Sequence, residues 1–144
     1  MDCRVTVMVR APREDVWRRW ADVPGWPGWN PACTEAAATP AMAEGAALRL
    51  RLRHPGGREF FTAPRVTRLE APERMEWLTR ALGLRAETVS ELVDEDDGTR
   101  VTVTSTSHGP LAFAYRLVMR PRTQALIHTQ MLNALSASFA DPDA

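Results

Sequence analysis

The stretch TQALIHTQMLNALSASFA, residues 123–140, decides the fold of this chain. It contains no Asp, Glu, Lys or Arg, and its apolar residues recur at helical spacing. At about 100° per residue, the large apolar side chains gather on one arc, formed by Ile127, Met131, Leu132, Leu135 and Phe139. The remaining positions are too polar for a membrane span. The pattern therefore predicts an amphipathic helix with one buried face.

Two large polar residues, Gln124 and His128, fall inside this apolar arc. A polar group sealed in an apolar core costs about 1–3 kcal/mol when it has no partner. Each residue therefore needs a protein partner, a water molecule or a ligand. In one interpretation, His128 is a core histidine bonded to a neighbouring strand. In the other, the helix covers a cavity that both side chains face.

The rest of the chain predicts an antiparallel sheet. Leu48, Leu50 and Leu52 alternate strictly with arginines, which is typical of a half-buried strand. Six strands are expected, over residues 3–9, 48–53, 60–69, 74–79, 85–93 and 99–107. Short helices are expected over 13–20 and, broken by prolines, within 22–31; residues 111–139 are expected to be helical with a break at Pro121. Because the loops are too short for parallel crossovers, the class is α+β.

Composition narrows the function classes. The 144 residues are expected to form a single domain, 1–144, with 44% hydrophobic and 25% charged residues. The 18 basic residues balance 18 acidic ones, which argues against nucleic acid as a partner. All the basic residues are arginine, so lysine Schiff-base chemistry is excluded. The three histidines and two cysteines match no metal-binding pattern, so neither a metal nor a cofactor is expected.

The N-terminus and the cysteines point to a cytoplasmic protein. The first residues contain no apolar signal segment, and no run approaches the about 20 apolar residues that a membrane span needs. We therefore expect no membrane insertion. Cys3 and Cys33 are expected to be free thiols, since disulfides are rare in reducing compartments.

Four motifs resemble one known family. Ala11-Pro12, Val16-Trp17, Asp22 and the stretch WPGWNP at 26–31 are similar to the opening signature of the polyketide cyclase/dehydrase-like branch of the START/Bet v 1-like (SRPBCC) superfamily. Three later motifs of that branch are matched in the same order by RMEW at 74–77, GTRVT at 98–102 and HGPL at 108–111. The resemblance covers nearly the whole chain.

The resemblance implies a helix-grip fold. In that fold a curved antiparallel sheet, here of about six to seven strands, wraps around a long C-terminal helix, with two short helices after the first strand. A hydrophobic cavity lies between sheet and helix. Members bind lipids, polyketides, hormones or other apolar molecules, and some catalyse cyclisation or dehydration. The fold alone does not choose among these activities.

The expected cavity mixes apolar walls with hydroxyl groups. Trp26 and Trp29 would either wall the cavity mouth or pin their loop to the sheet. Strand parity places the hydroxyls of Thr88, Ser90, Ser105 and Ser107 inward, where they suit a ligand that carries oxygen atoms, unless they bond within the sheet. The full expected lining is Trp26, Trp29, Leu50, Met75, Trp77, Ser90, Val103, Ser105, Leu117, Gln124, His128, Met131 and Leu135.

His128 is the first candidate for catalysis, because an imidazole titrates near neutral pH. Tyr115, Arg65 and Glu76 follow it, and no paired acid and base can be identified. Binding of a small hydrophobic ligand, lipid-like or polyketide-like, is therefore favoured over catalysis. The alternatives are a polyketide cyclase or dehydratase that uses His128, and a protein-interaction module with a vestigial cavity.

A homodimer is a further hypothesis. The segment before the last helix is apolar almost all round, and Leu126 is the one large apolar residue on the polar arc. A partner subunit would cover a second side of this segment. The interaction-module hypothesis in turn predicts an apolar surface patch around Met119 and Leu126. Alternatively, Pro121 kinks the helix and resets its register.

Overall fold

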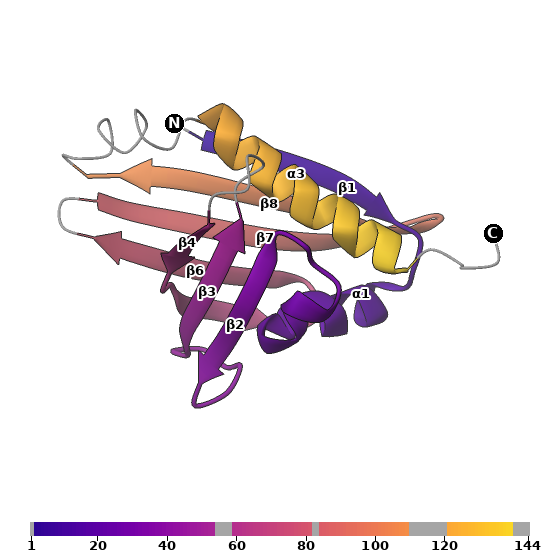
Figure 1. The fold of residues 1–144 in the computed structure, drawn as a ribbon. Coiled ribbons are helices and arrows are strands. Elements are labelled where there is room, and N and C mark those ends of the chain that lie inside the picture. Colours follow the sequence, from indigo (N-terminus) through magenta and orange to yellow (C-terminus); the bar gives the residue numbers. More distant parts are fainter. Residues whose placement is uncertain (1, 54–58, 82–83, 110–120, 140–144) are drawn as a thin grey trace.

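The computed structural model describes residues 2–53, 59–81, 84–109 and 121–139. In this part of the chain, an antiparallel sheet curves around a long helix, α3 (Pro121–Ser138), and two short helices lie at one end of the sheet (Figure 1). These are α1 (Arg13–Ala21) and the 3-10 helix η1 (Val23–Gly28), which follow the first strand directly. The observed architecture is the helix-grip fold, and the predicted α+β class is confirmed.

The sheet contains eight strands. Seven of them are hydrogen bonded in the order β1-β8-β7-β6-β5-β3-β2, and β4 pairs with β3 beside this path. The strands are β1 (Asp2–Val9), β2 (Cys33–Thr39), β3 (Ala47–Arg53), β4 (Glu59–Thr62), β5 (Arg65–Glu70), β6 (Arg74–Ala81), β7 (Leu84–Glu95) and β8 (Gly98–His108).

Two strand predictions need correction. The strand β2 was not predicted, because its stretch CTEAAAT is rich in alanine, which is depleted in strands. Pairing with β3 and the burial of Cys33 hold β2 at the sheet edge. The strand expected over 60–69, in which an interruption by Pro64 favours an edge or a bulge, is two strands, β4 and β5, separated around Pro64. Proline has no N–H for a strand ladder, although the Pro64 carbonyl still accepts a hydrogen bond from the Leu48 N–H (2.8 Å).

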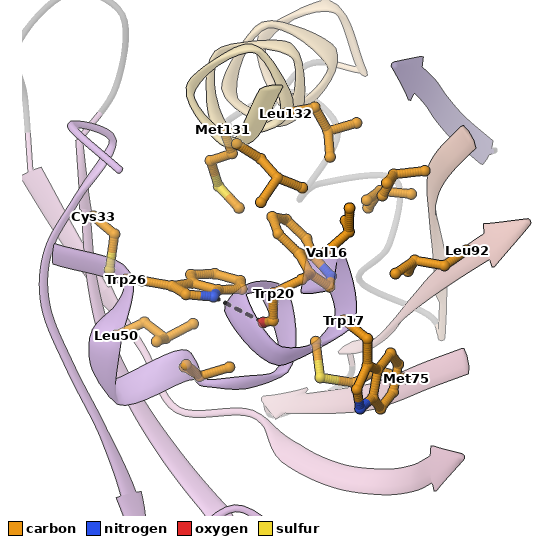
Figure 2. Close-up of a cluster of buried hydrophobic side chains, with 14 of the residues drawn as sticks. Val16, Trp17, Trp20, Trp26, Cys33, Leu50, Met75, Leu92, Met131 and Leu132 are labelled. Carbon is orange, nitrogen blue, oxygen red and sulfur yellow. Dashed lines mark hydrogen bonds between the residues drawn. The ribbon is translucent and has the colours of Figure 1, made fainter. Parts of the chain in front are cut away.

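The buried face of α3 is the predicted apolar arc. Ile127, Met131, Leu132 and Leu135 are all buried, whereas Leu126 is 50% exposed. Figure 2 shows Met131 and Leu132 reaching from α3 toward the layer that Trp20 and Trp26 form. The core therefore lies between α3, the inner face of the sheet and the short helices.

Four tryptophans form a connected cluster under α3. The ring centroids of Trp20 and Trp26 are 4.7 Å apart, Trp29 lies 6.1 Å from both, and Trp77 of β6 lies 5.7 Å from Trp26. The Trp26 Nε1–H donates to the Trp20 carbonyl (2.9 Å), as Figure 2 shows. This bond satisfies a carbonyl at the end of α1 and fixes η1 against it.

Arg19 ties α1 to the end of α3. Its Nη1 donates to the Ser138 carbonyl (2.8 Å) and to the Ser138 Oγ (2.9 Å), and its guanidinium lies 3.9 Å from the centroid of the Phe139 ring. A cation at a helix C-terminus is stabilised by the exposed carbonyls there. The contact fixes the last turn of α3 over the helical end of the sheet.

Cys3 and Cys33 are buried free thiols, as expected. Burial raises the pKa of both, that of Cys33 to about 11. Both are therefore protonated and unreactive at neutral pH. No helix within the described ranges is long and apolar enough to cross a membrane.

Candidate ligand cavity

A cavity of about 130 Å³ lies between α3 and the inner face of the sheet. Its walls come from η1, from α3 and from the inward faces of five strands, β3, β4, β6, β7 and β8. The described lining residues are Trp26, Leu50, Leu52, Phe60, Thr62, Trp77, Thr79, Ala86, Thr88, Ser105, Ile127, His128 and Met131.

Strand register builds the sheet side of this cavity. Side chains alternate between the two faces of a strand, so paired residues across neighbouring strands share a face. Trp77 pairs with Thr88, and Thr88 pairs with Ser105, which forms one inward row over β6, β7 and β8. On the other side, Leu52 pairs with Phe60. The α3 residues close the cavity above these rows.

The cavity has a closed end and a more open side. Trp26, Leu50, Ile127 and Met131 are buried and form the closed end. The wall residues toward the open side are only half-buried: Leu52, Phe60, Thr62, Thr79, Ala86 and Thr88. A ligand longer than the enclosed space would therefore extend past these six side chains.

The structure brings six of the predicted lining residues together. They are Trp26, Leu50, Trp77, Ser105, His128 and Met131. Leu117 lies outside the described residues, as does the side chain of Gln124.

Five other predicted residues lie away from the cavity: Trp29, Met75, Ser90, Val103 and Leu135. Met75 pairs with Ser90, and Ser90 pairs with Val103. These three residues form the inward row next to that of Trp77. That row belongs to the filled core, where Trp17 lies beside Met75 (Figure 2). Leu135 is buried one turn beyond Met131 in the same core, and Trp29 packs on Trp20 and Trp26. The helices α1 and η1 thus fill one end of the sheet and leave the other hollow.

The expected lining omitted seven residues that line the cavity: Leu52, Phe60, Thr62, Thr79, Ala86, Thr88 and Ile127. Strand parity nevertheless places Thr88 inward, and the apolar arc places Ile127 on the buried face of its helix. The signal for two others was present. Leu52 continues the Leu48 and Leu50 alternation, and Thr79 has the parity of Trp77. Phe60 and Thr62 had no such signal, because the break at Pro64 hides the register of β4.

His128 is the one lining residue, among those described, with a titratable side chain. The ring is half-buried, and its Nδ1 is enclosed without a hydrogen-bond partner among the described residues. Burial lowers the pKa of His128 from 6.5 to about 4. The imidazole is therefore neutral at pH 7, and the described walls carry no charge.

Among the described residues of the cavity wall, four carry hydroxyl groups: Thr62, Thr79, Thr88 and Ser105. The structure shows no hydrogen bond from any of them to another described residue. Hydroxyls within an otherwise apolar wall are available to bond water or ligand oxygen atoms. The arrangement can hold a neutral molecule with an apolar body and a few polar atoms.

The depressed pKa of His128 predicts a pH dependence of stability. The folded state disfavours the imidazolium, whereas the unfolded chain protonates freely below its pKa of 6.5. This group's contribution is therefore intact above pH 6.5 and is lost as the pH falls from there to about 4. The loss amounts to about 3 kcal/mol. Urea unfolding of wild type and His128→Leu from pH 7 to 4.5 measures it: the wild type should lose more stability than the variant. Parallel pH profiles for the two proteins would contradict the prediction.

The family model described as polyketide cyclase/dehydrase and lipid transport matches residues 2–139. The chain belongs to this family. The polyketide cyclase/dehydrase resemblance seen in the sequence is thereby confirmed. No curated protein matches the chain.

Solved structures share the fold of this polyketide cyclase/dehydrase family member. The di-domain ARO/CYC protein BexL of the BE-7585A biosynthetic pathway aligns with a TM-score of 0.80 and 15% identity, over 99% of this chain and 51% of BexL. The di-domain ARO/CYC protein StfQ of the steffimycin pathway aligns with 0.75 and 13%, over 96% and 50%. A START superfamily protein from Mycobacterium smegmatis aligns with 0.72 and 17%, over 96% of both chains. The chain thus spans about half of each di-domain protein, and at these identities the likeness shows the fold.

Two of the other catalytic candidates of this family member, Arg65 and Glu76, do not meet His128 in the cavity. Arg65 is exposed on β5. Glu76 accepts hydrogen bonds from Arg68 (3.2 Å) and Arg74 (2.7 Å) and is absent from the cavity wall. Tyr115 lies outside the described residues. Within the described ranges, no group of three or more His, Cys, Asp or Glu side chains could hold a metal ion.

Proposed function

We propose that this chain binds a small hydrophobic molecule in the cavity between α3 and the sheet, without altering it chemically. The observation that carries the proposal is the cavity itself, with aromatic and aliphatic walls and with hydroxyls to which no other described residue is hydrogen bonded. A residual space of this kind is costly to leave unfilled in a protein core. A bound ligand would fill this space and restore the missing packing contacts.

The volume sets the size of the enclosed part of the ligand. An engineered apolar cavity of about 150 Å³ holds benzene, and this cavity is slightly smaller at about 130 Å³. Drug-sized ligands occupy sites of about 300–1,000 Å³. We therefore assign one ring, or a short chain of similar volume, to the enclosed space, and any remainder of a polyketide-like or lipid-like ligand to the open side.

A cyclase or dehydratase is the second candidate, and His128 is the observation that favours it. A neutral imidazole can accept a proton from a substrate. General acid–base catalysis also needs a group that orients the base or completes the proton transfer, and no described residue bonds to the imidazole. Turnover of a bound polyketide that disappears in His128→Leu would establish this candidate. The sequence-based expectations of a cytoplasmic location and of a homodimer stay predictions.

Filling the cavity tests the binding proposal. Ser105→Leu adds a branched side chain inside the space, so it should weaken binding of toluene at least about tenfold, since steric exclusion removes most of the enclosed volume. Titration followed by NMR chemical shifts measures the affinity. Thr104→Leu is the matched control, because this neighbour on β8 is absent from the cavity wall, and its toluene affinity should stay within about twofold of wild type. Equal toluene binding by Ser105→Leu and wild type, or none by wild type, would refute the proposal.

A further inference from the structure

The polar atoms of the cavity gather on two facing walls. Thr88 and Ser105 lie directly opposite each other on β7 and β8, so their hydroxyls share one row of the inner face. His128 faces the same space from α3. Because the His128 Nδ1 is enclosed, Nε2 is the polar atom that the ring can offer to a ligand.

These groups can bond a neutral ligand in either direction. A hydroxyl both donates and accepts, and a neutral imidazole nitrogen does one or the other according to its tautomer. A ligand hydroxyl would find partners on both walls. A ligand without polar atoms would leave the hydroxyls and the imidazole unsatisfied beside apolar surface, which is unfavourable.

The same walls disfavour the binding of a charged ligand. None of the described lining residues is Asp, Glu, Lys or Arg. His128 supplies no positive charge at neutral pH, because burial lowers its pKa to about 4. A carboxylate placed here would be an unpaired ion in a low-dielectric site, which costs far more than a missing hydrogen bond.

We propose that His128, Thr88 and Ser105 make the cavity selective for neutral ring compounds that carry a hydroxyl group, and against carboxylates of the same size. This inference rests on the proposed binding function. To that function it adds the charge state of the preferred ligand and the residues that select for it. His128 acts here as a specificity-determining residue.

Three probes of similar size test the selectivity at pH 7: toluene, phenol and benzoate. Phenol loses water contacts on entering the cavity, so it should approach the affinity of toluene, within about threefold, only if the wall supplies hydrogen bonds. Benzoate should bind at least about 100-fold more weakly than phenol. NMR titration of the full chain gives all three affinities.

Variants assign the effect to particular residues. His128→Leu should lower the ratio of phenol affinity to toluene affinity about tenfold, as expected for one lost hydrogen bond at an enclosed site. Thr88→Val keeps the shape of the wall and removes one hydroxyl. It should also lower the ratio of phenol affinity to toluene affinity. Gln130→Leu, an exposed position on α3, is the control and should change neither affinity.

The outcomes separate the two proposals. Binding of toluene with benzoate as tight as phenol, or an unchanged ratio of phenol to toluene in both His128→Leu and Thr88→Val, overturns the selectivity and leaves the binding function standing. Absence of binding by all three probes overturns both. The predicted pattern of toluene, phenol and benzoate affinities supports both.

Discussion

Trp26→Ala is expected to lower the free energy of unfolding by about 3–5 kcal/mol, and the melting temperature by about 10–15 °C. Trp26 has 0% exposure and packs against Trp20 and Trp77. Removing the indole leaves a void at the junction of η1, β6 and α3. It also leaves the Trp20 carbonyl without its side-chain donor. Thermal unfolding followed by circular dichroism measures the change.

Two further variants separate packing from hydrogen bonding. Trp26→Phe keeps most of the ring and loses the donor, so it should cost about 1–2 kcal/mol. Phe61→Ala truncates an aromatic residue that is 65% exposed, and it should cost less than about 1 kcal/mol. A Trp26→Ala protein that melts as late as Phe61→Ala would show that the tryptophan cluster contributes little to stability.

Gly98→Ala is the second substitution with a large expected effect. Gly98 begins β8, and a Cβ added there would lie 2.1 Å from the Val9 carbonyl oxygen and 3.1 Å from the Arg10 Cα. Both are backbone atoms at the end of β1, so no side-chain rotation can relieve the clash. The turn between β7 and β8 would have to move away from β1, at a cost of about 2–3 kcal/mol.

Urea unfolding at fixed pH measures this cost, and Gly28→Ala provides the matched control. A Cβ at Gly28 meets no atom within 4 Å, and alanine restricts the unfolded chain more than glycine does. We therefore expect Gly28→Ala to be neutral or slightly stabilising. Equal stability of the two alanine variants would mean that the turn does not rest on β1 as described.

Periodicity predicted the parts of this fold that have one buried face. The apolar arc of α3 and the alternation of Leu48, Leu50 and Leu52 each record a simple geometric repeat, and both appear in the structure. The sequence of β2 shows no such repeat of large apolar residues. Its alanines favour no face strongly, and it becomes a strand because β3 offers it hydrogen-bonding partners.

Parity gives the face of a strand but not the depth along it. Met75 and Trp77 share a face of β6, yet Met75 belongs to the filled core and Trp77 lines the cavity. The difference depends on how far α1 and η1 reach along the sheet, which is a tertiary property. His128 could be singled out from the sequence, because a polar residue within an apolar arc is a local conflict visible in the helical repeat.

The tryptophan cluster provides an intrinsic fluorescence probe at the cavity. The contacting indole rings of Trp20, Trp26, Trp29 and Trp77 have centroids 4.7–6.1 Å apart. At these separations we expect excitation energy to pass between them. Two of its members, Trp26 and Trp77, line the cavity. A molecule that touches either ring perturbs the ultraviolet emission of the whole group. Tryptophan fluorescence is therefore expected to change when a molecule enters the cavity, without any attached dye. The change would arise from the whole cluster rather than from a single indole.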